Sequence, residues 1–186
     1  MRDKRLCGID EAGRGPLAGS LVVAGVVLKD KIDGLMDSKQ LSEKRRNELY
    51  PKIIANSIYH IVSFDAQTID RDGISKCLNV ALNEIKEHIE DCDYLFDGNS
   101  TFGVSGISTM VKADAKIAEV SAASILAKVT RDKEMIEYDK TYPEYGFAKH
   151  KGYATKAHYE ALKVYDRSPI HRKSFRVKCL DEKTLF

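Results

Sequence analysis

The chain has 186 residues, 43% of them hydrophobic and 31% charged, which suits a single domain (1–186) with a sizeable core. Its 30 Lys and Arg against 28 Asp and Glu leave a formal charge of +2, which excludes a histone-like protein held to DNA by bulk charge. No apolar run approaches the about 20 residues of a membrane span. Acids at positions 10 and 11 come too early for a signal peptide, so we expect a soluble, cytoplasmic chain with no membrane partner.

The first third of the chain alternates short apolar runs with one helical pattern. Residues 6–10 and 21–28 are strand candidates, and their spacing predicts an antiparallel hairpin with a wide loop. Ser42 opens a predicted helix that runs to about residue 55, although Pro51 should bend or break it. Residues 58–64 predict a third strand.

The remaining elements alternate helix and strand. Apolar residues at helical spacing predict an amphipathic helix over 74–90, followed by strands at 94–97 and 107–111. A long helix is expected over 114–138, and Thr155 can cap a last helix to about residue 165. The core face of the long helix is predicted to contain Ala118, Ala122, Ile125, Val129 and Ile136. A hairpin followed by this alternation predicts an α/β fold, a mixed sheet flanked by helices.

The densest chemical pattern lies between the first two strands. Asp10 and Glu11 directly follow an apolar run, and Gly13-Arg14-Gly15 comes next. A solvated turn would also be rich in Asp and Gly. We favour a functional site, because the apolar run carries the acids to the edge of the core and glycines let backbone N–H groups approach a ligand. The spacing matches neither a dinucleotide fingerprint nor a P-loop.

Two further acids lie at element ends. Asp97 closes a predicted strand before Gly98, and Asp114 precedes the long helix, where an N-cap would be its default role. Four such carboxylates gathered at one edge of a sheet would repel each other, a cost that divalent cations remove. Oxygen-only ligands indicate Mg²⁺ or Mn²⁺, and two such ions form a clamp for phosphodiester cleavage.

Residues 149–178 form a basic segment with nine Lys or Arg and two acids, a formal charge of +7 that leaves −5 for the rest. A basic run is often only a solvated face, but Tyr153 and Phe175 lie within this one, and the combination favours nucleic-acid binding. The basic helix start at 44–46 fits either a phosphate contact or a capped surface helix. His60 and His88 are lone residues on a strand and a helix, and we interpret them as structural.

These motifs together resemble the bacterial ribonuclease HII family, the type 2 ribonucleases H, over about residues 6–176. The resemblance is carried by five motifs in order: DEAGRGPLAG at 10–19, Asp97-Gly98-Asn99, Asp114-Ala115-Lys116, the helix at 121–132, and the segments 149–156 and 168–175. The chain departs from the family pattern at Ser20, where proline is usual, at Ala113, where glycine is usual, and in the more polar run 119–121.

The resemblance implies an RNase H-like fold with a small helical, substrate-binding C-terminal extension at about 149–186. It also implies cleavage of the RNA strand of RNA–DNA hybrids and incision 5′ to single ribonucleotides in duplex DNA, leaving 3′-hydroxyl and 5′-phosphate ends. Asp10, Glu11, Asp97 and Asp114 would hold two Mg²⁺ or Mn²⁺ ions. Gly13-Arg14-Gly15 would read the 2′-hydroxyl and Tyr153 would stack on the next deoxynucleotide. Candidate phosphate contacts are Lys39, Lys128, Arg131 and Lys151.

Two alternatives remain at this stage. The chain could be another metal-dependent nuclease, such as a junction resolvase or a hybrid-only enzyme, although such a nuclease has no use for a reader of the 2′-hydroxyl. It could instead be a nucleic-acid-binding module whose acids only cap turns and helices. In either case we expect nucleic acid as the partner and a monomeric chain.

Overall fold

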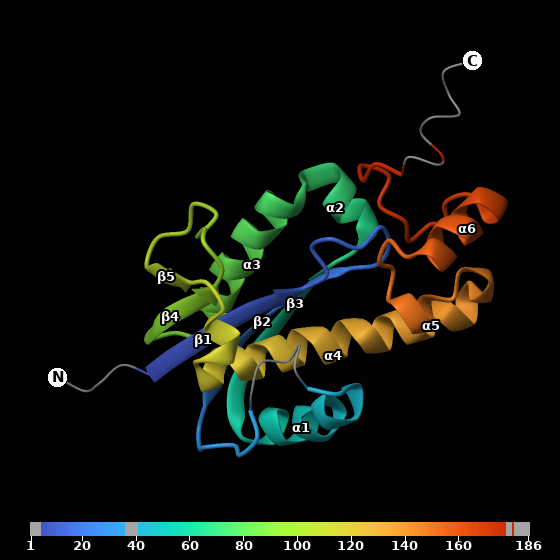
Figure 1. Cartoon of the computed structure of the whole chain (residues 1–186). Helices are drawn as coiled ribbons and strands as arrows, with labels where there is room; N and C mark the ends of the chain where they lie inside the picture. The colour runs from blue at the N-terminus through green and yellow to red at the C-terminus, as the bar shows by residue number, and fades with distance from the viewer. Residues whose placement is uncertain (1–4, 36–40, 178–179, 181–186) are drawn as a thin grey trace.

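Residues 5–35, 41–177 and 180 are described by a computed structural model, drawn in Figure 1. Its strands are β1 (Arg5–Ala12), β2 (Leu21–Leu28), β3 (Ser57–Phe64), β4 (Cys92–Asp97) and β5 (Ile107–Met110). They form one sheet in the order β3-β2-β1-β4-β5. The β1–β2 and β2–β3 pairs are antiparallel, whereas β4 runs parallel to both β1 and β5. The predicted hairpin and mixed sheet are thus confirmed.

Helices cover both faces of this sheet (Figure 1). The α-helices are α1 (Glu43–Ala55), α2 (Ala66–Asp72), α3 (Ile74–His88), α4 (Ala118–Thr141), α5 (Phe147–His150) and α6 (Lys156–Tyr165). The helices α2 and α3 lie on one face and α1 and α4 on the other, while α5 and α6 pack beyond the C-terminal end of α4. No helix in the described part of the chain combines the length and apolarity that crossing a membrane requires.

The interior strand β2 shows why two layers of helices form. Its sequence LVVAGVVL is buried over its whole length except at Leu28. Because successive side chains point to opposite faces, Leu21, Val23 and Val27 join the core beneath α3, whereas Val22 and Val26 join the core beneath α1 and α4. A strand that is apolar on both faces must be covered on both.

The close approach of α4 to β1 depends on Gly8. A Cβ atom at this position would lie 2.3 Å from the backbone of Glu119 and Val120, so a side chain here would push the helix off the sheet. This contact sets the start of α4 against the strand that carries Asp10 and Glu11, and so helps to position the site described below.

Two helices differ from their predicted form. Pro51 neither breaks nor ends α1, which continues to Ala55 because Leu49 and Ile53, on either side of the proline, are fully buried and hold the last turn in place. The long helix begins at Ala118, and Asp114 lies before it in a 3₁₀ turn, Ala113–Ala115. Of its predicted core face, the two end positions were wrong: Ala118 is exposed and Ile136 only half-buried, while the middle positions are buried.

Candidate active site

Three carboxylates meet at one edge of the sheet. Asp10 lies near the end of β1, Asp97 ends β4, and Asp114 lies in the turn before α4. The strands β1 and β4 are parallel and Ile9 pairs with Phe96, so the two following aspartates lie side by side. One ligand oxygen of each of the three lies within 4.8 Å of the others. Asp10 and Asp114 are buried and Asp97 is half-buried.

The electrostatics of this carboxylate cluster favour a bound cation. Burial raises the pKa of Asp10 well above its ordinary value, and the neighbouring Glu11 charge raises it further, while a hydrogen bond from the Ser124 hydroxyl acts in the opposite direction. The Glu11 N–H donates to Asp10 at 2.7 Å, and the Ala113 N–H donates to Asp97 at 3.1 Å. An oxygen-only set of close, largely buried carboxylates fits a hard divalent cation such as Mg²⁺ or Mn²⁺.

Glu11 lies beside the cluster but is not one of its three members. Successive side chains of β1 point to opposite faces, and the Glu11 carboxylate lies 2.8 Å from Nε of Arg14. It lines, together with Asp10 and Asp97, a cavity of about 280 Å³. The structure therefore brings three of the four predicted acids together and places the fourth on the same cavity, paired with an arginine.

The glycine-rich loop forms another wall of this cavity, and Gly13, Arg14 and Gly15 all line it. Gly13 has φ +100°, and a Cβ there would lie 2.4 Å from the Arg131 side chain and from the Ser20 carbonyl oxygen, so only glycine fits. A Cβ at Gly15 would meet nothing within 4 Å, so the backbone there is open to a ligand.

Two buried arginines hold this loop from behind. The Arg172 guanidinium is fully buried and donates to four backbone carbonyls of the loop, those of Gly13, Arg14, Gly19 and Ser20, at 2.6–3.0 Å. Burial, and then the charge of Arg131, lower the pKa of Arg172 to about 10. Arg131, also fully buried, donates to the carbonyls of Ser20 and Ala18. The loop is thus attached to α4 and to the C-terminal segment.

Tyr153 faces the same cavity, with 43% of its surface exposed. A chain of buried imidazoles holds its backbone. The Ser168 N–H donates to Nδ1 of His171, so the proton of that ring is on Nε2 and is donated to Nε2 of His158, 2.9 Å away. His158 must then carry its proton on Nδ1, which donates to the Tyr153 carbonyl at 2.9 Å. Burial lowers the pKa of both histidines to about 4, so both rings are neutral.

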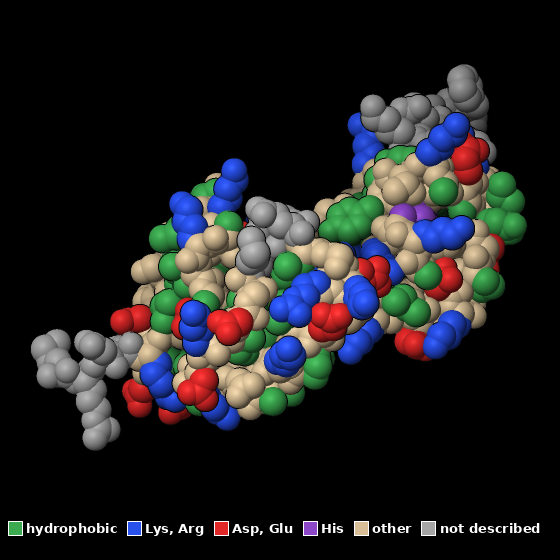
Figure 2. All heavy atoms as spheres, turned by 60° about the horizontal axis from the view of Figure 1, so that its bottom comes forward, with side chains coloured by type: hydrophobic (Ala, Val, Ile, Leu, Met, Phe, Trp, Pro, Cys, Tyr) green, Lys and Arg blue, Asp and Glu red, His purple; other side chains and the backbone are tan. Residues whose placement is uncertain are grey.

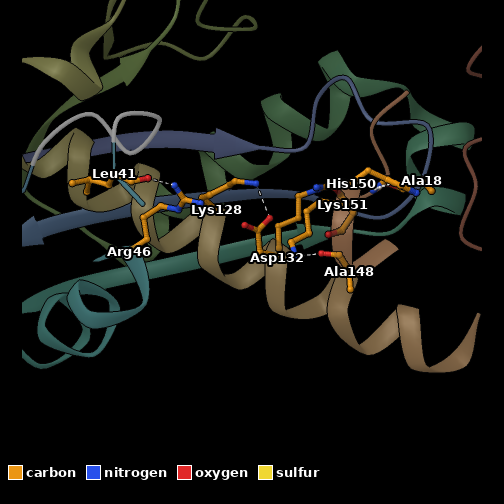
Figure 3. A network of polar contacts seen from close by, with 11 residues as sticks. Ala18, Leu41, Arg46, Lys128, Asp132, Ala148, His150 and Lys151 are labelled. Atoms are coloured by element: carbon orange, nitrogen blue, oxygen red, sulfur yellow. Dashed lines mark hydrogen bonds and ion pairs between the residues drawn. The ribbon is translucent and has the colours of Figure 1, made fainter. Parts of the chain in front are cut away.

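The predicted phosphate contacts meet different outcomes. Lys128 lines the cavity, and Figure 3 shows its ammonium group directed at Asp132, 2.6 Å away. The prediction for Arg131 was wrong, because this side chain is fully buried, with Nε and one terminal nitrogen donating to backbone carbonyls, and does not reach a phosphate at the surface. The prediction that Lys151 contacts phosphate was also wrong, because this side chain is 9% exposed and donates to the Ala148 carbonyl. Lys39 lies outside the described residues.

Two polar cavity residues were not predicted as site residues. Ser124 hydrogen-bonds Asp10 and lines the cavity four residues before Lys128, a helical spacing that could have indicated a shared face. Arg46, at the basic start of α1, lines the cavity and donates to the Leu41 carbonyl (Figure 3). On the face that carries α1 and α4, Figure 2 shows basic and acidic side chains intermixed, so the basic residues form no single large patch there.

Comparison with known proteins places the chain among nucleases. A family model described as "Ribonuclease HII" matches residues 7–178. The chain is 69% identical to a ribonuclease HII of Sulfurovum sp. (strain NBC37-1), over 98% of this chain and 97% of that protein, and 57% identical to one of Aliarcobacter butzleri (strain RM4018), over 96% and 94%. The crystal structure of ribonuclease H2 from Pyrococcus horikoshii OT3 superposes with a TM-score of 0.76 at 29% identity, covering 92% of this chain and 94% of that one. The predicted RNase H-like fold is confirmed.

Proposed function

The chain belongs to the ribonuclease HII family and is a ribonuclease H; from this premise we propose that it also incises duplex DNA 5′ to a single embedded ribonucleotide. The observation that carries the proposal is one cavity lined by acids of the carboxylate cluster, by the backbone of the 13–15 loop and by Tyr153. A cutting centre and a means of recognising the sugar then share one pocket. We expect it to act as a monomer in the cytoplasm, where bacterial DNA is accessible.

In this proposal Asp10, Asp97, Asp114 and Glu11 hold two divalent cations, Mg²⁺ or Mn²⁺. When bound, such ions activate the attacking water and stabilise the leaving 3′-oxygen. The clustered acids supply the negative charge that retains the ions. Ser124 donates to Asp10 and the Ala113 N–H donates to Asp97, and these hydrogen bonds orient both carboxylates at the cavity wall. Cleavage of the bond between phosphorus and the 3′-oxygen leaves a 3′-hydroxyl and a 5′-phosphate.

Recognition of the ribonucleotide would come from the loop and the tyrosine. The open backbone at Gly15 can hydrogen-bond a 2′-hydroxyl, the group that distinguishes RNA from DNA. Tyr153, more than 40% exposed, can stack on the deoxynucleotide that follows. Arg172 keeps the loop carbonyls turned inward, and the His158–His171 pair keeps the Tyr153 backbone in place. Lys128 and Arg46, at the cavity wall, are the candidates for phosphate contact.

The alternatives fit less well. A pure DNA nuclease gains nothing from a backbone held open beside its acids by two buried arginines. A binding module would not need three carboxylates within 4.8 Å of each other, because their repulsion destabilises the fold unless cations bind.

The decisive experiment incubates the purified chain with Mn²⁺ or Mg²⁺ and three labelled duplexes: one ribonucleotide in DNA, an all-RNA strand on DNA, and all DNA. We expect a nick 5′ to the ribonucleotide and no cutting of the all-DNA duplex. Equal cutting of the all-DNA duplex would refute the recognition of the 2′-hydroxyl. Cutting of the hybrid alone would restrict the chain to the hybrid-only alternative.

The role of Tyr153 can be isolated by Tyr153→Ala. Because base–aromatic stacking is worth about 1–3 kcal/mol, we expect cutting at a single ribonucleotide to fall by about 5- to 150-fold while metal binding is retained. Tyr59→Ala is the matched control, since Tyr59 is 40% exposed against 43% for Tyr153 and lies on β3, away from the cavity. An equal loss in both variants would remove Tyr153 from the mechanism.

A further inference from the structure

A histidine interrupts the apolar face that β3 turns toward α3. Side chains alternate along this strand, and Ile58, Val62 and Phe64 pack into the core beneath α3. His60, between Ile58 and Val62, is the remaining residue of the same face and is only half-buried. A polar ring at this place must have polar partners, since burying it without them costs free energy.

Those partners come from the last two turns of α3. Glu84 and His88 are four residues apart, so both project from one side of the helix. Nε2 of His60 lies 2.9 Å from a Glu84 carboxylate oxygen, and the rings of His60 and His88 stack at a centroid distance of 3.8 Å and an interplanar angle of 10°. One ligand atom from each of the three lies within 4.8 Å of the other two. The tertiary structure thus joins two histidines that the sequence analysis treated as unrelated.

The hydrogen bonds leave ligand atoms available. Nδ1 of His88 lies 2.8 Å from the Glu84 backbone carbonyl, which only accepts, so the neutral ring carries its proton on Nδ1 and a lone pair on Nε2. A backbone carbonyl on the other ring nitrogen is the usual arrangement of a metal-binding histidine. In the ion-free protein the Nε2–H of His60 donates to Glu84. A metal ion would take the place of that shared proton.

This His60–Glu84–His88 cluster is separate from the carboxylate cluster. In the sheet, Ile9, Gly25 and His60 pair in one row across β1, β2 and β3, and Ile9 belongs to the core beneath α3. Asp10 is the next residue of β1 and therefore points to the opposite face, toward α4. Changes at His88 should leave the catalytic cavity intact.

We propose that His60, Glu84 and His88 form a second metal site, which binds a first-row transition ion of the Zn²⁺ type and links the edge strand β3 to α3. Two imidazoles and one carboxylate are a donor set that suits Zn²⁺, with a fourth position open to water. Mg²⁺ prefers oxygen ligands, so the site discriminates against the ion expected at the carboxylate cluster. The proposal goes beyond nuclease activity and does not depend on it.

The test is competition for Zn²⁺ between the purified full chain and a chromophoric chelator, in excess Mg²⁺ that occupies the carboxylate cluster. We compare the wild type with His88→Gln and His60→Gln, and use Glu87→Gln, an exposed acid on the same turn, as the matched control. The wild type and Glu87→Gln should each bind one more Zn²⁺ than His88→Gln, or bind it at least about tenfold more tightly.

His60→Gln changes a half-buried side chain, so a loss of Zn²⁺ binding in that variant could also reflect misfolding. A second measurement therefore uses the exposed His88. Zn²⁺ should raise the Tm of the wild type and of Glu87→Gln but not that of His88→Gln, because an ion that binds only the folded state stabilises it. His88 is exposed, so its substitution should not unfold the chain, and Mg²⁺-dependent cutting should be unchanged in it. The same Zn²⁺ stoichiometry and affinity in the wild type and His88→Gln would overturn the proposal.

Discussion

Two charged clusters lie beside the 13–20 loop, one of arginines and one of carboxylates, and they are stabilised in different ways. The positive group, Arg131 and Arg172, is fully buried, and six hydrogen bonds to backbone carbonyls surround the two guanidiniums. The negative group consists of Asp10, Asp97 and Asp114, and two of these acids, Asp10 and Asp97, line the cavity. Backbone carbonyls surround the arginines, whereas the carboxylates lie close enough together to bind a cation from solution.

This difference separates a structural charge cluster from the one that we propose to bind metal. Backbone carbonyls carry no net charge, so they can surround Arg172 permanently without cancelling its charge, and the result is a rigid loop. The carboxylates repel each other, and the raised pKa of Asp10 shows that burial and Glu11 disfavour its ionised form. The carboxylates, whose mutual repulsion the fold does not compensate, are therefore the group that can take up cations.

The largest expected effect comes from Asp97→Asn. Cutting should fall on the order of a thousandfold, the loss typical of removing one charge-stabilising group from an active site. The metal-free protein should keep or gain thermal stability, since one repulsive charge is removed. Asp93→Asn, an exposed position on the same strand, is the control for both the cutting rate and the Tm. Near wild-type cutting by Asp97→Asn would contradict the assignment of the metal site.

Arg172→Lys should have the opposite effect on stability. A single ammonium group cannot reach the four carbonyls that the guanidinium fork contacts, so buried acceptors lose their partners and the free energy of unfolding should drop by about 3 kcal/mol. Urea denaturation measures this, with the exposed Arg176→Lys as the control. If both variants were equally stable, the loop would not depend on Arg172.

A smaller effect per residue is expected from pH. His158 and His171 have pKa values of about 4 in the folded protein against about 6.5 in the unfolded chain, so the unfolded chain binds more protons between these values. Stability should therefore fall as the pH decreases from 7 to 5, by about 2 kcal/mol per histidine. Thermal unfolding across this range measures the slope. The variant His171→Asn should be less stable at pH 7 and show a flatter slope; an unchanged slope would exclude this histidine as its source.

Elements whose sequence pattern depends on neighbouring residues were predicted well, whereas short elements and element ends were not. The strands at 21–28 and 58–64 and the helix at 74–90 were predicted closely, because their apolar periodicity depends on neighbouring residues alone. The short helices α2 and α5 were missed, since seven and four residues carry little periodicity. The start of α4 was placed too early because a polar residue before a helix indicates a cap, and the structure uses Asp114 in a separate turn.

By itself, the sequence determined the location of the acids at strand ends, because an apolar run that stops at a carboxylate places that group at the edge of the sheet. It also located the glycine loop and Tyr153, through their composition. Only the tertiary structure decided which basic residues face the cavity. Arg131 and Lys151 are of the residue types that contact phosphate, but both are buried and donate to backbone carbonyls. It alone also joined His60 to Glu84 and His88, and His158 to His171. Such pairings depend on segments distant in sequence, and periodicity contains no information about them.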